Sequence, residues 1–313
     1  MKILSYNIRG LGDTAKRRVI REVLCRNQVD MVCIQETKSS YVDRRLCAQL
    51  WGDTEFDWRA IPAVNAADDL LCIWKLNTFV LEDFVQGSGY LGLIGFWEHS
   101  HQKCVIVNVY SACNLDQKMI LWAALRDWKA SCSILAWCLA EDFNSVWCEE
   151  ERRGIAQTNS SQRRDMYEFN SFISDMVISD IPLAGKKFTW QRPNNMALSR
   201  IDRFLVSDHW SELWPNCSQL VMDRDISDHC LLLLRRSVED WGPKPFHIMG
   251  NSLWRIKGVI ESYRLNFGKS YVFMNHYFVR KPEQNGLQKE MKIPVTSIPQ
   301  LTESGVPTLY WGY

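Results

Sequence analysis

The sequence lacks any run of about 18 consecutive apolar residues, so it predicts no transmembrane helix. No signal peptide is expected either, because Met1 and Lys2 lead straight into a short apolar strand without the longer apolar core of a secretory leader. No two cysteines have the CxxC spacing, and their number, 11, is odd. Five cysteines in apolar runs are expected to be buried thiols of a reducing compartment: Cys25, Cys33, Cys72, Cys104 and Cys230. We therefore expect a soluble intracellular protein, nuclear or cytoplasmic.

A strong net charge is absent as well. The 37 basic and 36 acidic residues give a formal net charge of +1, so attraction to nucleic acid would need a local basic patch. A hydrophobic content of 46 % in 313 residues is enough for a substantial core. After about residue 236 the composition changes, and Lys269–Tyr313 carries prolines with little periodicity. We expect one domain over residues 1–236 and a partly disordered tail or truncated linker over residues 237–313.

Short β-prone runs recur along the chain, with helical patterns between some of them. Asp13 is predicted to cap a helix whose apolar positions, from Ala15 to Leu24, fall on one face. Leu115–Trp128 and Met166–Met176 repeat this helical pattern. Strands are expected at Lys2–Asn7, Met31–Glu36, Leu70–Trp74, Val80–Phe84, Cys104–Tyr110, Ile134–Leu139, Phe188–Gln191, Ile201–Val206 and Cys230–Leu234. The mixture predicts an α/β (α+β) fold in which two packed β-sheets form a sandwich flanked by helices on both outer faces.

Six polar residues end or follow these apolar runs, and most of them would therefore lie at the carboxyl end of a buried strand. They are Asn7, Glu36, Asp142, Asn144, Asp228 and His229. Active sites of sheet proteins collect at such positions. Acidic and amide side chains that converge with one histidine suit a divalent cation, an activated water and a charged leaving oxygen.

Several short sequence motifs occur together along the chain, in this order: SYNIRGLG, QETK, VNVYSA, FTWQRP, SRIDRFLVS and SDHC. This set resembles the endonuclease/exonuclease/phosphatase superfamily, which includes deoxyribonuclease I and the apurinic/apyrimidinic endonucleases. Within it, the words are most similar to the endonuclease domain of plant non-LTR (LINE-type) retrotransposons. The resemblance covers roughly Met1 to Arg236, with a fainter echo in DWGPKPF, and it implies the same two-sheet fold.

The resemblance implies a metal site. Glu36 matches the glutamate that holds the metal, and a hard oxygen donor suits Mg²⁺, with Mn²⁺ as an alternative. Asn7 matches a residue that orients the phosphate and the metal ligands, and Asp228 matches an auxiliary carboxylate near the metal. By itself, Glu36 would more often be a solvated charge, and Asn7 could be a turn residue before Gly10.

The resemblance also implies catalytic roles. Asp142 and Asn144 stand two apart, so in an extended segment they face the same side, and the matching pair activates and positions the attacking water; an Asx-type turn is the alternative. His229 matches the group that stabilises charge on the phosphate, and Asp202 its orienting aspartate. Tyr110 matches a tyrosine that contacts the phosphate, although a core-edge tyrosine is as common at a strand end.

Basic residues with a nearby tryptophan suggest a surface for double-stranded DNA. The candidates are Arg163, Arg164, Lys187, Trp190, Arg192 and Arg200. An ordinary mixed surface is the alternative, because the acidic run Glu149–Glu151 dilutes the cluster.

Two positions depart from the family pattern. Glu141 stands where glycine usually precedes the DFN triplet, and since adjacent strand residues face opposite sides, its carboxyl is expected to point into a packed interior. Asp68 and Asp69 replace a usual Gly-Gly pair.

The sequence predicts a monomeric, Mg²⁺-dependent endonuclease that nicks DNA by in-line attack of water, with no membrane partner. Its rivals are a phosphomonoesterase or lipid phosphodiesterase of the same superfamily, and an inactive product of a decayed element that at most binds DNA.

Overall fold

The computed structural model describes residues 1–236 except 64–68, 98–100, 155–158 and 193–196, and of Glu141 it describes the backbone alone. The chain divides into two compact units, Met1–Glu239 and Asp240–Tyr313. In the second unit the structure describes only β17 (Phe273–Met274) and β18 (Tyr277–Phe278), which pair antiparallel. The rest of the expected tail lies outside the described residues.

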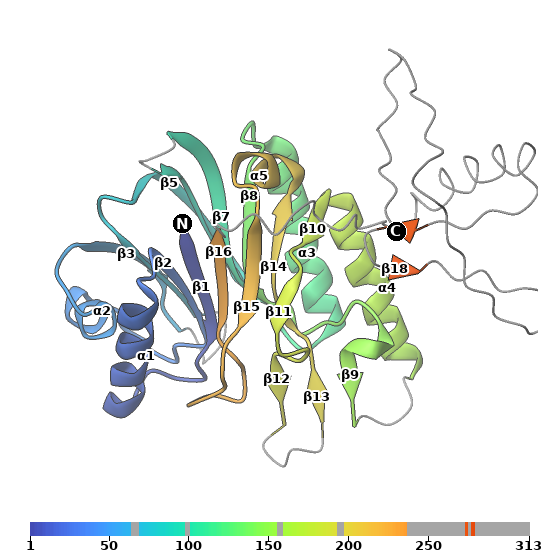
Figure 1. Ribbon diagram of the computed structural model, residues 1–313, viewed down its shortest axis with the longest axis horizontal. Coiled ribbons are helices and arrows are strands. Elements are labelled where there is room, and N and C mark those ends of the chain that lie inside the picture. The colour runs from blue at the N-terminus through green and yellow to red at the C-terminus, as the bar shows by residue number, and fades with distance from the viewer. Residues whose placement is uncertain are drawn as a thin grey trace, which may run out of the picture. The chain divides into compact units, whose positions relative to one another are not determined.

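The first unit contains two large sheets (Figure 1). One is built from β1 (Lys2–Asn7), β2 (Met31–Gln35), β3 (Phe56–Ile61), β4 (Leu70–Lys75), β11 (Leu183–Gly185), β15 (Cys217–Val221) and β16 (Leu232–Arg236). Its strand order is β11-β15-β16-β1-β2-β4-β3. Strands β1 and β2 are parallel, so their carboxyl ends lie at the same edge, with Asn7 opposite Gln35.

The second sheet is built from β5 (Phe79–Gly87), β6 (Tyr90–Trp97), β7 (Gln102–Tyr110), β8 (Trp137–Asp142), β10 (Ile178–Asp180) and β14 (Asp202–Ser207). Its order is β10-β14-β8-β7-β6-β5. Strands β7 and β8 are parallel, which puts Tyr110 opposite Asp142, and the antiparallel β14 begins at Asp202 beside the same Asp142. A three-stranded sheet of β12 (Trp190–Gln191), β13 (Leu198–Ser199) and β9 (Arg152–Arg153) lies at the end of the sandwich where β1 also ends (Figure 1).

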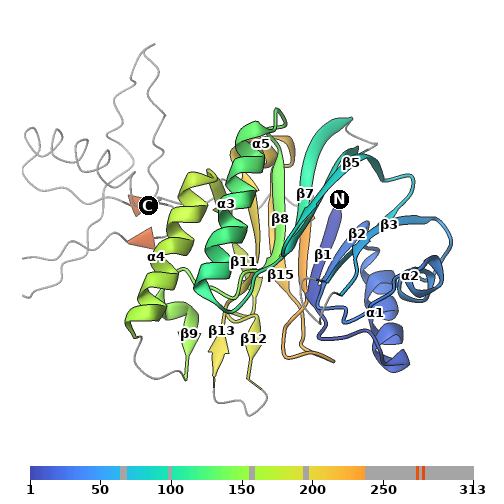
Figure 2. The same cartoon turned by 180° about the vertical axis from the view of Figure 1, so that it is seen from behind.

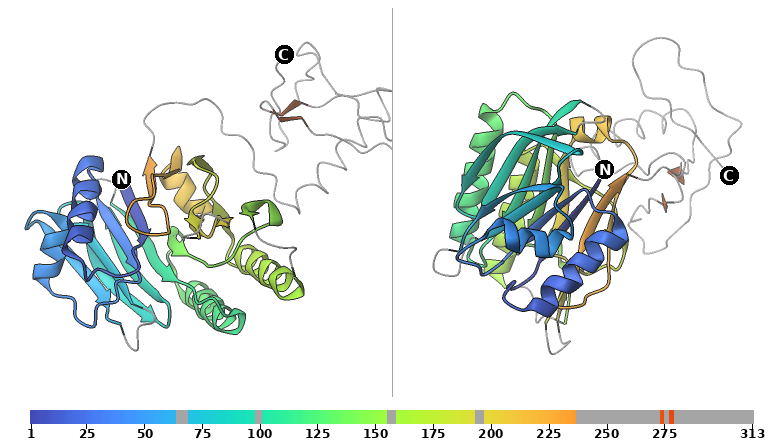
Figure 3. Two further views of the ribbon diagram at one scale, coloured as in Figure 1. Left: turned by 90° about the horizontal axis from the view of Figure 1, so that it is seen from below. Right: turned by 90° about the vertical axis from the view of Figure 1, so that its left-hand side faces the viewer.

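Helices cover both outer faces, as the sequence predicts. The first sheet carries α1 (Thr14–Asn27) and α2 (Arg44–Trp51), and the second carries α3 (Leu115–Ser131) and α4 (Ser160–Asp175), which lie side by side (Figure 2). The two sheets lie between these helix pairs (Figure 3). The short α5 (Asp208–Leu213) and the 3-10 turn η1 (Glu149–Glu151) complete the described helices. Asp13 caps α1 by accepting a hydrogen bond from the Ala15 amide at 2.8 Å.

Apolar side chains fill the space between the sheets and the space under the helices. Ile3 and Cys33 from the first sheet meet Ile106 and Phe204 from the second. A polar bridge joins the sheets inside this core: the Gln35 side chain donates to Asn108 Oδ1 at 2.7 Å, and Asn108 Nδ2 donates to the Ile34 carbonyl at 3.1 Å. These buried hydrogen bonds fix one sheet on the other.

Some sequence expectations need correction. The segment expected as a strand from Ile134 begins at Trp137 and continues to Asp142. Cys25 is exposed, because it lies on the solvent side of α1, whereas Cys33, Cys72, Cys104 and Cys230 are buried as expected. In the first unit, the strands β3, β6, β9, β10, β11, β13 and β15 and the helices α2 and α5 were not predicted.

Candidate active site

Three of the predicted residues meet at the Asn7 side chain. The Asn7 amide nitrogen donates to Glu36 Oε1 at 2.9 Å and to Asp142 Oδ2 at 2.8 Å. Because both carboxylates bind the same nitrogen, their oxygens are no farther apart than these two distances added together. They nevertheless come from different sheets, since Glu36 follows β2 and Asp142 ends β8. Asn7 Oδ1 accepts from the Arg9 amide at 3.2 Å, which fixes the orientation of the amide group.

His229 lies between two aspartates and is 1 % exposed. Its Nδ1 contacts Asp202 Oδ1 at 2.9 Å, and its Nε2 lies 3.7 Å from Asp142 Oδ2. Burial alone would lower the pKa of His229, but the negative charges of Asp202 and Asp142 outweigh burial and raise it to about 9. Burial raises the pKa of Asp142 to about 7, against the opposing effect of His229. At neutral pH the imidazole is therefore protonated, while Asp142 is poised between its two forms.

Asn144 is held through its backbone as well as its side chain. It has a left-handed φ of 49°, and its amide nitrogen donates to Asp142 Oδ1 at 3.1 Å while Nδ2 donates to the Ser111 carbonyl at 2.7 Å. Its carbonyl accepts from the buried ammonium of Lys118 at 2.7 Å, and Lys118 pairs with Asp165 at the same distance. The loop after β8 is therefore anchored to α3 and α4.

Tyr110 contacts the carboxylate of Glu36. Burial and the negative charges of Glu36 and Asp142 raise the pKa of the Tyr110 phenol, and a hydrogen bond to Glu36 adds to this effect. The phenol is therefore a hydrogen-bond donor at neutral pH, directed at the group that is predicted to hold the metal.

Asp228 binds two donors from elsewhere in the chain. Its Oδ1 lies 2.7 Å from Arg9 Nε, and its Oδ2 accepts from the Trp190 indole at 2.9 Å. The neighbouring Ser227 hydroxyl donates to the Asn7 carbonyl at 2.8 Å, which ties this loop to β1. Asp228 therefore lies beside the site through Arg9 and Trp190, and its predicted metal role stays a prediction.

One departure from the family pattern has a structural function. Asp69 is buried and accepts hydrogen bonds from the Thr37 hydroxyl, at 2.7 Å, and from the Lys38 amide. It therefore fastens the loop that carries Glu36. Asp68 lies outside the described residues. The Glu141 backbone pairs with Val109 and Arg203, but its side chain is also outside them, so the expected burial stays a prediction.

A sequence-family model described as the endonuclease/exonuclease/phosphatase family matches residues 4–229. The chain belongs to this family. No curated protein matches the sequence. The narrower likeness to plant retrotransposon endonucleases stays a prediction.

Solved structures show the same fold as the family match. An apurinic/apyrimidinic endonuclease from Leishmania major superposes with a TM-score of 0.60 at 17 % identity, covering 74 % of this chain and 86 % of that one. A 3′ phosphatase from Neisseria bound to a product DNA hairpin gives 0.56 at 16 %, covering 76 % and 99 %. A mannosyl-6-phosphatase from Bacteroides thetaiotaomicron gives 0.50 at 14 %, covering 75 % and 98 %. These likenesses confirm the predicted two-sheet fold.

Members of this family generally use divalent metal ions, and the donors here fit one. Asp142, Asp202 and His229 offer ligand atoms within 4.8 Å of one another. Asp202 is already bonded to His229, however, and a protonated imidazole does not bind a cation. The carboxylate oxygens of Glu36, 13 % exposed, are the hard donors that Mg²⁺ prefers.

The predicted DNA-binding residues lie in different settings. Arg163 and Arg164 are exposed on α4 and lie 3.9 Å from Glu149 and 3.8 Å from Glu168, and Lys187 and Arg192 are exposed. Arg200 is only 16 % exposed, because Glu151 and Asp180 bind its guanidinium. Trp190 is half-buried against Asp228. The guanidinium of Arg200 therefore already has two carboxylate partners, and its predicted contact with DNA stays a prediction.

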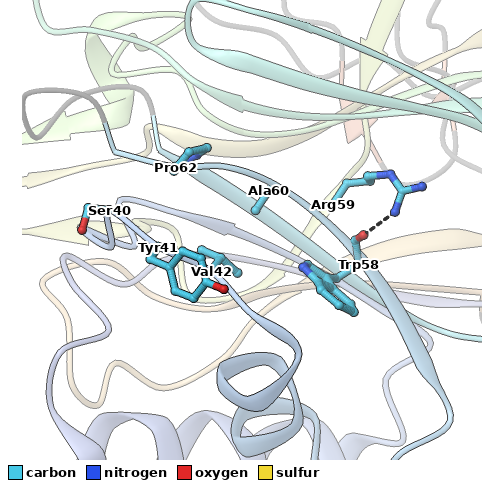
Figure 4. A pocket seen from close by; sticks show the side chains of 7 residues that line it. All are labelled: Ser40, Tyr41, Val42, Trp58, Arg59, Ala60 and Pro62. Atoms are coloured by element: carbon cyan, nitrogen blue, oxygen red, sulfur yellow. Dashed lines mark hydrogen bonds between the residues drawn. The ribbon is translucent and has the colours of Figure 1, made fainter.

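A pocket of about 280 Å³ opens beside the loop after β2 (Figure 4). Its lining residues come from this loop, from β3 and from the residue that follows β3: Ser40, Tyr41, Val42, Trp58, Arg59, Ala60 and Pro62. None of the carboxylates of the site lines it. A second, of about 540 Å³, lies at the starts of α3 and α4 and includes Arg164.

Sequence reasoning missed three charged residues that contact the site: Arg9, Lys38 and Lys118. Arg9 and Lys38 are part of the words SYNIRGLG and QETK, so their proximity could have been inferred from the adjacent Asn7 and Glu36. Lys118 lies within an apolar helix pattern, and a lysine there carries no signal of its partner Asp165, 47 residues away.

Proposed function

We propose that this protein is a divalent-metal-dependent endonuclease, with Mg²⁺ as its ion, that nicks double-stranded DNA by in-line attack of water and leaves a 3′-hydroxyl. The observation that carries the proposal is the contact of one buried carboxylate, Asp142, with both Asn7 and the His229–Asp202 pair. This arrangement places a base, Asp142, next to an orienting amide, Asn7, and a charged acid, His229. The origin in a plant LINE-type retrotransposon is part of the proposal and rests on the sequence words alone.

Each side chain has a role in this reaction. Asp142, with a pKa of about 7, accepts the proton of the attacking water. Asn144 holds that water in line. The imidazolium of His229 stabilises the charge that builds on the non-bridging phosphate oxygens, and Asp202 keeps it charged and oriented. The Tyr110 hydroxyl contacts the phosphate.

Glu36, with Asp228 as an auxiliary carboxylate, would hold the metal ion. Asn7 donates to Glu36 and Asp142 and so orients both carboxylates. The ion supplies electrostatic stabilisation of the phosphate and of the leaving oxygen.

A supercoiled-plasmid assay with Mg²⁺ and with EDTA tests the function. We expect metal-dependent nicking by the full chain, and we expect His229→Ala and Asp142→Ala each to reduce its rate by at least about a hundredfold. DNA affinity should stay nearly intact in both, because these groups act on the transition state. His209→Ala, at a half-exposed histidine that pairs with Glu212, is the matched control and should keep full activity.

Two other outcomes would contradict the proposal. Hydrolysis of phosphomonoesters or inositol phosphates without nicking would assign the chain to the phosphatases of the family. DNA binding without metal-dependent turnover would instead indicate an inactive product.

A further inference from the structure

Asp69 is a buried carboxylate that binds the loop after β2. Its side chain is almost fully buried, and one of its oxygens accepts from the Thr37 hydroxyl at 2.7 Å and from the Lys38 amide. Burial of a carboxylate is costly unless hydrogen bonds replace its water. The glycine that is usual at this position in the family has no side chain to accept either bond, and the mechanism above gives Asp69 no role.

The strand pairing places Asp69 beside the predicted metal ligand. Strands β2 and β4 are antiparallel, and at this end of the ladder Gln35 lies opposite Leu70. Glu36 follows Gln35 and Asp69 precedes Leu70, so one further step along the ladder puts Asp69 opposite Glu36. The carboxylate of Asp69 then binds the two residues that follow Glu36. Asp69 therefore acts on Glu36 through the backbone of the loop.

This loop has a conformation that needs support from outside. Glu36 has a φ of 50° and Lys38 a φ of 52°, in the left-handed region that is disfavoured for residues with a Cβ. Such conformations persist only where the surrounding structure fixes them. The Gly10 amide fixes the loop from the side of β1, because it donates to the Glu36 carbonyl at 2.7 Å. Asp69 fixes it from the side of β4.

The same support extends to the Glu36 carboxylate. Asp69 holds the Lys38 amide, and the ammonium of Lys38 lies 3.4 Å from Glu36 Oε2. Glu36 Oε1 accepts from the Asn7 amide nitrogen at 2.9 Å. Each of the two oxygens therefore has a donor whose position the loop sets. A ligand that is already held in one direction loses less conformational entropy when an ion binds to it.

We propose that Asp69 is a positioning residue for the metal site, which holds the loop after β2 so that the Glu36 carboxylate is preorganised for a divalent cation. The proposal rests on the proposed function in taking Glu36 as the ligand of that cation. Groups that orient a metal ligand contribute about 10–100-fold to metal affinity. Asp69 should therefore set the affinity for the ion and leave the rate at saturating ion unchanged.

Binding of Mn²⁺ to the full chain, followed by the loss of the electron paramagnetic resonance signal of free Mn²⁺, tests this without turnover. Glu36→Gln identifies the binding that belongs to the site. We expect Asp69→Ala to raise the dissociation constant of that binding about tenfold. In the plasmid assay it should raise the Mg²⁺ concentration for half-maximal nicking by a similar factor and leave the saturated rate unchanged.

Asp69→Asn separates position from charge, because the amide keeps an acceptor oxygen in the same shape. It should bind Mn²⁺ nearly as tightly as the parent chain. If Asp69→Asn loses as much affinity as Asp69→Ala, the charge of the carboxylate is responsible and the inference fails.

Asp30→Ala is the matched control. Asp30 directly precedes β2 as Asp69 directly precedes β4, and its carboxylate also accepts from a backbone amide, that of Lys2, at 2.8 Å. It lies at the opposite end of β2 from Glu36. Thr37→Val removes one of the two bonds to Asp69 at nearly constant volume, and should weaken Mn²⁺ binding even if Asp69→Ala does not fold. Dissociation constants for both variants equal to that of Asp30→Ala would overturn the inference.

The inference and the proposed function can fail separately. A parent chain that binds Mn²⁺ through Glu36, loses affinity in Asp69→Ala and never nicks DNA would keep the inference and contradict the proposed function. A parent chain that nicks DNA while Asp69→Ala binds Mn²⁺ as tightly as the parent would contradict the inference alone. A parent chain that binds no Mn²⁺ through Glu36 would also overturn the inference.

Discussion

At the scale of single residues, four non-glycine residues in the loops after β1, β2 and β8 have a left-handed backbone: Arg9, Glu36, Lys38 and Asn144. Each such conformation costs of order 1 kcal/mol. Hydrogen bonds to the adjacent backbone compensate, as at Asn144, whose amide nitrogen donates to Asp142 and whose carbonyl accepts from Lys118. The backbone conformation therefore sets the direction of these side chains, and it does so at a cost in folding stability.

The buried histidine makes stability depend on pH. The pKa of His229 is about 9 in the folded chain and about 6.5 when unfolded. Because the folded pKa is the higher one, its contribution is complete below about pH 6.5 and is lost as the pH rises through 9. We expect the free energy of unfolding to fall by ~3 kcal/mol over this window, measured by urea unfolding in EDTA.

Asp142 acts in the same direction at lower pH, since its folded pKa of about 7 lies above the ordinary value. Its effect is a decrease in stability from about pH 4 to pH 7. His229→Gln should remove the decrease that the histidine contributes and move the one from Asp142 to higher pH, because His229 opposes the rise in the pKa of Asp142. The half-exposed His209→Gln should leave both. A flat profile for the parent chain between pH 7 and 9 would contradict the raised pKa of His229.

At the scale of elements, α3 holds the catalytic loop after β8 through a single buried lysine. Lys118→Met should leave Asp165 as a buried carboxylate without its cation and lower the free energy of unfolding by about 3–5 kcal/mol. Adding Asp165→Leu should recover much of this loss, because the unpaired charge is removed. Urea unfolding of the two variants checks this, and equal stability of the single and double variants would show that the pair carries no such coupling.

The elements that the sequence revealed are those with continuous apolar runs. Lys2–Asn7 is correct to the residue, and the strand ends brought Asn7, Glu36 and Asp142 to one edge. Strand β6 was missed because Gly92 and Gly95 interrupt its pattern. A Cβ at Gly92 would come 2.1 Å from the Trp128 ring, and one at Gly95 would come 2.2 Å from the Val80 carbonyl. These glycines are required by close packing, a cause that lies in distant segments.

The same reasoning explains what was missed in the site. Asn7 and Asp142 are predictable from their strands, but the partner of Arg9 is Asp228, and the Ser227 hydroxyl next to it binds Asn7 across 220 residues of chain. The antiparallel pairing of β16 with β1 brings these segments together. A list of local patterns contains no information on that pairing.

At the scale of the whole molecule, the first compact unit carries every residue of the site. We predict that residues 1–239 fold alone, with a melting temperature within a few degrees of the full chain and the same nicking rate, since the unit has its own core. Calorimetry and the plasmid assay on both forms check this. A truncated chain that aggregates would show that residues 240–313 contribute to the core.

Because Asn7 belongs to one sheet and Asp142 to the other, their hydrogen bond of 2.8 Å measures the alignment of the sandwich. One residue of a strand advances about 3.3 Å, so a slip of the sheets by a fraction of that step would separate base from orienting amide while most apolar contacts survived. The polar bridge of Gln35 and Asn108 restricts such a slip from inside the core. A substitution that disturbs the core should therefore lower the catalytic rate before it lowers the melting temperature. The catalytic rate is then the more sensitive measure of how the two sheets are aligned.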